Sequence, residues 1–234
     1  MTDPGRREEL ALRLADVRGR MAKACEAAGR DVSELTLIAV TKTRPASDVR
    51  LLAGLGVADV GENRDAEAAP KAAECAGLNL TWHFVGQLQT NKAASVVRYA
   101  SVVHSVDRLR LVRALGRAAR GAERVVECLV EVSLDGDPAR GGAVAGDVPA
   151  LAEALAAEEG LVLGGVMAIA PLSMEPADAF ARLLASAAAV RGVRAGATVV
   201  SAGMSGDLEA AVEAGATHLR IGTALLGDRG PRVR

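Results

Sequence analysis

The sequence predicts a single (β/α)8 TIM-type barrel with an additional helix at its N-terminal end. Short apolar runs rich in β-formers alternate with stretches of helical periodicity. Such alternation is typical of a parallel sheet, because parallel neighbours need a crossover connection. Eight strand-like runs fit a closed barrel, and the 234 residues of the chain suit one α/β barrel of ordinary size.

Pattern alone leaves two alternatives open. The length permits two small domains, and a doubly wound open sheet shows the same alternation. We expect one domain over 1–234, because no internal repeat or low-complexity linker stands out. The Gly-rich stretch 135–146 is expected to be the longest surface loop rather than a domain boundary.

The first expected helix covers 3–29, within an N-terminal segment 1–30 that we expect to pack on the barrel. Its apolar residues recur at three- and four-residue spacing: Leu10, Leu14, Val17 and Met21. Gly29 is typical of a helix stop.

The remaining elements are expected in strict alternation. The predicted strands are 36–41, 58–61, 82–85, 101–104, 124–132, 163–168, 198–201 and 218–221. The predicted helices are 47–54, 65–76, 91–99, 107–119, 147–158, 176–191 and 207–214. The first strand illustrates the pattern, since a β-rich apolar run in LTLIAVTKTRP is closed by a proline.

Composition and charge exclude several function classes. The chain is 50% apolar and 24% charged, as in an ordinary globular domain, and its net charge of −1 provides no drive toward nucleic acid or an anionic membrane. Its four aromatic residues are too few for a base-stacking surface. No apolar stretch has the length of a signal peptide core or a membrane span, so we expect a cytoplasmic protein. Three cysteines without CxxC spacing indicate reduced thiols rather than disulfides or a zinc site.

Polar residues follow the predicted strands, where barrels place their chemistry. Lys42 comes directly after the first apolar run. A lysine at the barrel mouth is partly desolvated, which favours the neutral amine that imine formation requires. A solvated loop lysine is the competing interpretation, and pattern alone places it only slightly behind.

The segment SAGMSGDLEAAVEAG is a candidate anion site, since we expect a helix to begin near Ser205 or Gly206 with its N–H groups facing an anion. Gly222 and Thr223 follow the next strand, and the last two loops of a barrel commonly bind phosphate. An ordinary serine cap and glycine turn would look the same.

Arg220 lies between Leu219 and Ile221, so strand alternation places it on the opposite face from both. Inside the barrel its guanidinium would need an acceptor; an outward arginine paired with a helix glutamate is equally compatible with the pattern. His83 and His104 lack a third ligand at metal-like spacing and are expected to be structural or site-lining residues, with no metal bound. The chain has neither GxGxxG nor a Walker P-loop.

Several motifs, in order along the chain, carry a family resemblance. They are AVTKTRP, VGEN, WHFVGQLQTNK, HSVDR, GVMAI and GMSGDLEAAVEAGATHLRIGTALLG, and they cover 37–227. On these motifs the chain resembles the YggS/PROSC family (PLPBP) of pyridoxal-phosphate-binding proteins, also called pyridoxal phosphate homeostasis proteins. The family is similar to the barrel domain of alanine racemase standing alone.

The resemblance implies pyridoxal 5′-phosphate as cofactor and a role for each matching residue. Lys42 matches the Schiff-base lysine, and Arg220 matches the arginine that faces the pyridine nitrogen. Asn63 matches an asparagine near the cofactor ring. The phosphate cradle is matched by Ser201, Ser205, Gly222 and Thr223, with backbone contributions from Gly203 and Met204, while Met167 and Ile169 line the pocket.

The chain departs from the family pattern at a few positions. Thr41 replaces a common serine but keeps a hydroxyl, Ala202 replaces a common methionine, and Gly206 replaces a polar or acidic residue. The segment GENRDAEA lacks the glutamine of the family pattern, which puts one polar contact in doubt. The lysine and the proposed phosphate donors are all retained.

A bound cofactor leaves the question of catalysis open. An arginine beside the pyridine nitrogen disfavours its protonation and weakens the ring as an electron sink. In the related racemases a tyrosine from a second domain supplies the opposing base, whereas the single Tyr99 of this chain is expected away from the site, packing at the surface. We therefore expect a protein of pyridoxal phosphate homeostasis and amino-acid and keto-acid balance, without robust catalysis.

Two rival functions stay open at this point. One is a slow amino-acid racemase or eliminase that uses the cofactor; the other, weaker, is an open-barrel enzyme without a cofactor. A monomer is expected, because the second domain that forms the usual racemase dimer contact is missing. Apo forms of pyridoxal-phosphate-dependent enzymes are expected recipients of the cofactor, with no nucleic-acid or membrane partner.

Overall fold

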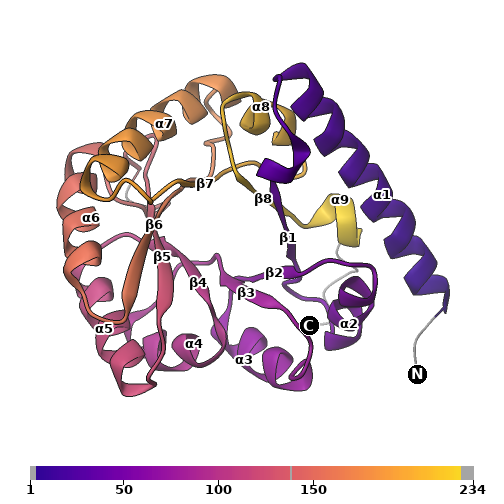
Figure 1. Cartoon of the computed structure of the whole chain (residues 1–234), viewed down its shortest axis with the longest axis horizontal. Coiled ribbons are helices and arrows are strands. Elements are labelled where there is room, and N and C mark those ends of the chain that lie inside the picture. Colours follow the sequence, from indigo (N-terminus) through magenta and orange to yellow (C-terminus); the bar gives the residue numbers. More distant parts are fainter. Residues whose placement is uncertain (1–3, 138, 228–234) are drawn as a thin grey trace.

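A closed parallel barrel forms the centre of the computed structural model, which describes residues 4–137 and 139–227 (Figure 1). Its strands are hydrogen-bonded in sequential order from β1 to β8, and β8 pairs back onto β1 with Arg220 opposite Ile38. The predicted (β/α)8 barrel is confirmed, and the β1–β8 pairing excludes the open sheet. That a single domain accounts for all of 1–234 stays a prediction.

Helices surround the barrel, one or more between successive strands. The strands are β1 (Thr36–Val40), β2 (Asp59–Glu62), β3 (Thr81–Phe84), β4 (Val102–Val106), β5 (Val126–Glu131), β6 (Leu161–Met167), β7 (Val199–Ser201) and β8 (His218–Ile221). The α-helices are α1 (Pro4–Ala27), α2 (Ala46–Gly54), α3 (Asp65–Glu74), α4 (Ala93–Tyr99), α5 (Leu109–Gly121), α6 (Val148–Ala157), α7 (Pro176–Val193), α8 (Leu208–Glu213) and α9 (Thr223–Leu226). Short 3-10 turns are η1 (Val32–Glu34), η2 (Thr90–Lys92) and η3 (Ala145–Asp147).

Some predicted boundaries are wrong in ways that matter for the site. The helix predicted over 207–214 is α8, which begins at Leu208. A start near Ser205 or Gly206 is wrong, because the Met204 N–H donates to Asp207 Oδ1 at 2.6 Å and closes a turn first. Strand β4 continues to Val106, so His104 lies within the strand. The helix expected over 91–99 begins with the 3-10 turn η2, and the short helix α9 was not predicted.

The N-terminal helix α1 lies outside the ring of helices and contacts α2, α8 and α9 (Figure 1). Arg20 anchors it through Glu209 of α8 at 2.8 Å and through the carbonyl of Ser205 at 3.0 Å. The predicted N-terminal helix is confirmed, although its expected first residue, Asp3, lies outside the described residues. That the whole segment 1–30 packs on the barrel stays a prediction. In the described part of the chain, no helix has the length and apolar character to cross a membrane.

Two apolar regions stabilise the fold. The larger lies between the strands and the surrounding helices, where alternate strand residues meet the apolar faces of the helices. The smaller is inside the barrel, where Val102, Leu129 and Met167 pack together from β4, β5 and β6. The interior also holds buried polar side chains, among them Arg220, Ser201, His104 and His83, and this arrangement prepares the site.

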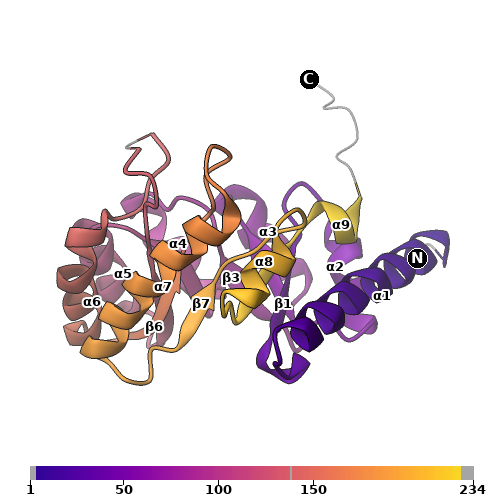
Figure 2. The same ribbon diagram turned by 90° about the horizontal axis from the view of Figure 1, so that it is seen from above.

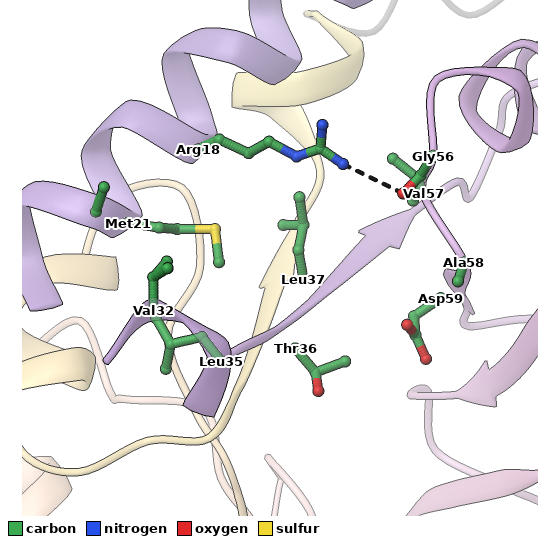
Figure 3. Close-up of a pocket in the computed structure, with 11 residues that line it drawn as sticks. Arg18, Met21, Val32, Leu35, Thr36, Leu37, Gly56, Val57, Ala58 and Asp59 are labelled. Carbon is green, nitrogen blue, oxygen red and sulfur yellow. Dashed lines mark hydrogen bonds between the residues drawn. The ribbon is translucent and has the colours of Figure 1, made fainter. Parts of the chain in front are cut away.

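The carboxyl ends of the strands meet at one mouth of the barrel, called here the C-terminal mouth. Figure 2 shows the loops after β5 and β6 rising on the same side as α9. At the opposite, N-terminal mouth, α1 and the loop before β2 border a cavity of about 520 Å3 (Figure 3).

Candidate functional site

Lys42 follows β1 at the C-terminal mouth, and its backbone is held by a buried ion pair. The hydroxyl of Thr41 donates to Glu62 Oε1 at 2.6 Å. The ammonium of Lys71, on α3, donates to the same oxygen at 2.5 Å and to the carbonyl of Thr41 at 2.8 Å. Lys42 itself is half-buried. Burial raises the pKa of Glu62, while the hydrogen bonds from Lys71 and Thr41 oppose that rise.

Thr43 adopts a left-handed backbone conformation directly after Lys42, with φ of 64°. A β-branched residue is strained there, and such strain persists where the surroundings enforce it, often at functional sites. Its N–H donates to Glu67 Oε2 at 3.0 Å. The guanidinium of Arg44 donates to the carbonyl of Gly227 at 2.7 Å, which ties the segment after β1 to the segment after β8.

Asn63 is half-buried after β2, in contact with the segment after β3. A Cβ at Gly86 would lie 2.2 Å from the carbonyl oxygen of Asn63, so only glycine permits this approach. Met167 is fully buried inside the barrel, whereas Ile169 is 42% exposed at the mouth.

Arg220 points into the barrel, and the residue is buried, with 5% of its surface exposed. It donates to Ser201 Oγ at 2.6 Å and to the carbonyl oxygen of Ala168 at 2.8 Å. Both acceptors are neutral, and no carboxylate among the described residues hydrogen-bonds it. Burial lowers the pKa of Arg220 to about 10, so the group stays cationic at neutral pH. The alternative of an outward arginine is excluded.

The loops after β7 and β8 meet at the same mouth, as predicted for a shared anion site. The Ala224 N–H donates to Ser205 Oγ at 3.1 Å, and Thr223 beside it is exposed. Gly203 has φ of 89°, and a Cβ there would lie 2.6 Å from Ala211 Cβ. The Met204 N–H is already bound to Asp207 and would have to exchange that acceptor to reach a phosphate.

The sequence pattern did not predict Glu131 as a candidate functional residue. Glu131, at the end of β5, has a buried carboxyl whose Oε2 lacks a partner within the described chain, and burial raises its pKa to about 7. It lines a cavity of about 130 Å3 with Arg140 and Ile169. A single glutamate beside a glycine-rich loop produces no periodic pattern in the sequence. Only the folded barrel shows that its carboxyl is buried at the end of β5.

Tyr99 lies away from the mouth, as expected, and is half-buried on the helix side of the barrel, but its hydroxyl is not at the surface. Its hydroxyl is buried without a hydrogen-bond partner in the described structure, and burial together with Asp65 and Glu62 raises its pKa. The ring meets Trp82 edge-on, with centroids 6.4 Å apart, on the helix side of the barrel. The predicted site-lining histidines are in contact with each other, since His83 Nδ1 lies 2.9 Å from His104 Nε2.

No cluster of three or more metal-ligating side chains occurs in the described ranges. The three cysteines are buried free thiols. The groups that converge at the C-terminal mouth are therefore an amine, a guanidinium, a carboxyl and hydroxyls.

A family model for the alanine racemase N-terminal domain matches residues 15–230. The pyridoxal phosphate homeostasis protein of Mycobacterium bovis is 45% identical, with 97% of this chain and 95% of that protein aligned. The protein of the same name from Pseudomonas aeruginosa is 40% identical over 94% of this chain and 96% of its own length.

Solved structures agree with these relatives. PipY of Synechococcus elongatus, solved with PLP bound, is 35% identical and superposes with a TM-score of 0.81, covering 93% of this chain and all of PipY. An alanine racemase from Corynebacterium glutamicum superposes with a TM-score of 0.68 at 15% identity, which shows a shared fold alone. The superposition covers 94% of this chain and 60% of that racemase.

Proposed function

This chain belongs to the alanine racemase N-terminal domain family, and on that premise we propose that it is a pyridoxal phosphate homeostasis protein. It binds pyridoxal 5′-phosphate at the C-terminal mouth and holds the cofactor on Lys42 as a Schiff base. The relatives with this name and the PLP-bound PipY structure support the proposal.

The observation that carries the proposal is the guanidinium of Arg220 at the mouth that Lys42 occupies. Arginine has five N–H donors, and two of those on Arg220 have protein acceptors, both neutral. A buried cation without a carboxylate is costly unless a further acceptor completes its surroundings. A pyridine nitrogen is an uncharged acceptor of this kind.

The residues present fit the cofactor, which supplies an electrophilic aldehyde and an electron sink when bound. Lys42 supplies the amine and Arg220 the donors for the ring nitrogen. Asn63 and Met167 border the ring. Ser205, Gly222 and Thr223, with the backbone of Gly203 and Met204, would hold the phosphate. The hydroxyl oxygen of Ser201, the remaining predicted member of that cradle, accepts a hydrogen bond from Arg220.

Binding without robust catalysis is the function that these groups support best. Arg220 is cationic, so like-charge repulsion keeps the ring nitrogen unprotonated. The single tyrosine of the chain lies on the helix side of the barrel and cannot act as an opposing base at the mouth. We infer a cytoplasmic monomer that buffers the cofactor and passes it to apo forms of dependent enzymes.

Glu131 favours a second candidate function, a slow racemase or eliminase. Strand β5 lies across the eight-stranded ring from β1, so Glu131 and Lys42 stand on opposite sides of the mouth. A carboxyl with a pKa of about 7 is suited to exchange protons near neutral pH. Purified protein with a panel of L- and D-amino acids tests this candidate: turnover abolished by both Lys42→Ala and Glu131→Gln would establish it.

Borohydride reduction followed by peptide mass mapping tests the cofactor attachment. The other lysines of the chain are Lys23, Lys71 and Lys92, so the adduct can be assigned to one residue. We expect it on Lys42 in the wild type and in a Lys92→Ala control, and none in Lys42→Ala. An adduct on another lysine, or no adduct, would overturn the attachment.

A further inference from the structure

Five polar side chains cross the barrel interior end to end, from the C-terminal mouth to the N-terminal mouth. Arg220 donates to Ser201 Oγ at 2.6 Å, and that oxygen is 3.0 Å from His104 Nδ1. His104 Nε2 is 2.9 Å from His83 Nδ1, and His83 Nε2 is 3.0 Å from Asp59 Oδ1. The chain thus joins β8, β7, β4, β3 and β2.

The interior members of this chain are sealed from solvent, and one end is not. His104 and Ser201 have no exposed surface, and His83 is 2% exposed. The side chain of Asp59 keeps 24% of its surface exposed and lines the cavity at the N-terminal mouth. Figure 3 shows Asp59 at the edge of that cavity across from Met21 of α1.

When both imidazoles are neutral, the two ends determine where every proton in the chain lies. An arginine can only donate and a carboxylate can only accept. His83 therefore donates from Nε2 to Asp59 and accepts at Nδ1, which makes His104 the donor from its own Nε2. His104 Nδ1 is then an acceptor, and it takes the hydroxyl proton of Ser201, whose oxygen accepts from Arg220.

We propose that Asp59, His83 and His104 form a one-directional hydrogen-bond relay whose role is to position Ser201 and Arg220 at the cofactor site. The relay turns the Ser201 hydroxyl proton away from the mouth, so Ser201 offers Arg220 a lone pair and nothing else. Arg220 then keeps its orientation with its remaining donors toward the ring. This deepens the proposed function and rests on it, and it makes Ser201 an acceptor for Arg220 rather than a phosphate donor.

The surroundings favour a neutral imidazole for His104 in this relay. Burial, with His83 and Arg220 close by, holds the pKa of His104 well below its ordinary value. His218 of β8 faces His83 with ring centroids 6.4 Å apart, and burial lowers the pKa of His218 to about 4. Glu127 of β5 faces the same histidine and, with Asp59, is the negative group at this end.

The wild-type protein without any cofactor tests the relay directly. The chain has three histidines, so long-range proton–nitrogen NMR spectra of 15N-labelled protein can be assigned with single substitutions. We expect His83 and His104 to be neutral with the proton on Nε2 in both. A proton on Nδ1 of either residue, or a doubly protonated ring at neutral pH, would overturn the relay whether or not the protein binds pyridoxal phosphate.

A matched pair of variants tests the positioning role. In His83→Asn the amide oxygen can still accept from His104, whereas His83→Leu offers no acceptor. We expect His83→Leu to weaken pyridoxal phosphate binding about tenfold, the scale of one hydrogen bond, and His83→Asn to stay within about twofold of the wild type. Thermal unfolding and circular dichroism of both variants check the fold.

A ligand comparison separates positioning from a general structural effect. The benzene analogue of pyridoxal phosphate, with carbon in place of the ring nitrogen, cannot use the donors of Arg220. We expect the His83→Leu variant to bind this analogue with an affinity within about twofold of the wild-type value. An equal loss for both ligands, or no loss for either, would overturn the positioning role. A wild type that binds neither ligand would refute the proposed function, while the NMR result still decides the relay.

Discussion

The two mouths of the barrel differ in what they offer a ligand. A cavity of about 520 Å3 borders the N-terminal mouth, and its lining is mainly aliphatic, with Arg18 and Asp59 as its charged members. At the C-terminal mouth, Glu131 and Arg140 line a cavity of about 130 Å3, and the pKa of the Glu131 carboxyl is raised. Lys42 and Arg220 belong to the neighbouring strands β1 and β8 at that mouth, where barrels place their chemistry.

Backbone organisation shows the same contrast. At the C-terminal mouth Thr43 is strained and Gly86 and Gly203 permit close approaches, while a buried ion pair holds the backbone beside Lys42. At the N-terminal mouth, Arg18 makes one exposed hydrogen bond to the carbonyl of Gly56. Glu123, before β5 on the N-terminal side, is also left-handed with φ of 52°, so strain alone does not distinguish the two mouths. The buried ion pair beside Lys42 is what sets the C-terminal mouth apart.

The largest expected effect comes from breaking the buried pair behind Lys42. Lys71→Met should lower the free energy of unfolding by about 3 kcal/mol, because Glu62 is left buried without its cation. Urea unfolding at neutral pH measures the change. Lys92→Met is the control, since its ammonium is 48% exposed and 3.8 Å from Asp65, and it should cost below about 0.5 kcal/mol. Equal losses of stability in Lys71→Met and Lys92→Met would contradict this difference between buried and exposed ion pairs.

Glu131→Gln should stabilise the protein at high pH. The pKa of Glu131 is about 7 in the fold and near 4.5 when unfolded, so the folded protein keeps a proton that the unfolded chain releases. The contribution of Glu131 to the free energy of unfolding is present below pH 4.5 and is lost as the pH rises through 7. Glutamine does not titrate, so the variant has no such loss. We expect the variant to gain about 2 kcal/mol over the wild type between pH 5 and pH 8 in urea unfolding.

The titration of His218 changes stability with pH in the opposite direction, and it does so in both the wild type and the Glu131→Gln variant. Its pKa of about 4 in the fold means that its contribution is lost as pH falls below 6.5. The comparison of wild type with Glu131→Gln cancels this common effect. A variant whose advantage does not change with pH would show that the Glu131 carboxyl is ionised in the fold.

The Thr223→Val variant tests whether the loops after β7 and β8 bind the phosphate. Loss of one hydroxyl donor to a phosphate is expected to weaken pyridoxal phosphate binding about tenfold, because hydrogen bonds to charged groups are the stronger kind. Pyridoxal, which lacks the phosphate, should bind both proteins equally. An absorbance titration with each ligand measures the two affinities, and a loss with pyridoxal as well would place Thr223 elsewhere in the site.

The smallest effect is expected from Arg18→Ala at the N-terminal mouth. It removes one exposed hydrogen bond and should change stability by about 0.5 kcal/mol or less, with cofactor affinity unchanged. Titration with pyridoxal phosphate and urea unfolding of the same preparation check both. A change of more than about threefold in affinity would contradict the functional difference between the mouths.

Local pattern predicted the order of the elements well, because each strand and helix carries its own periodicity. It failed at 205–208, where the hydrogen bond from the Met204 N–H to Asp207 delays the helix. A side-chain acceptor that competes with the helix leaves the apolar spacing unchanged, so periodicity does not detect it. The expected position of Tyr99, at a helix end away from the site, agrees with the structure, but a helix end does not reveal which neighbours bury the hydroxyl.

By itself, the sequence determined the alternation of strands and helices and placed Lys42, Arg220 and the two phosphate-loop segments at strand ends. These properties depend on spacing within short stretches of chain. Only the tertiary structure decided that Arg220 points inward, that His83 meets His104, and that Glu131 and Lys42 come from opposite sides of the ring of strands. The contact between His83 and His104 depends on the pairing of β3 with β4, and the ring itself depends on the β1–β8 pairing, which brings together residues far apart in sequence.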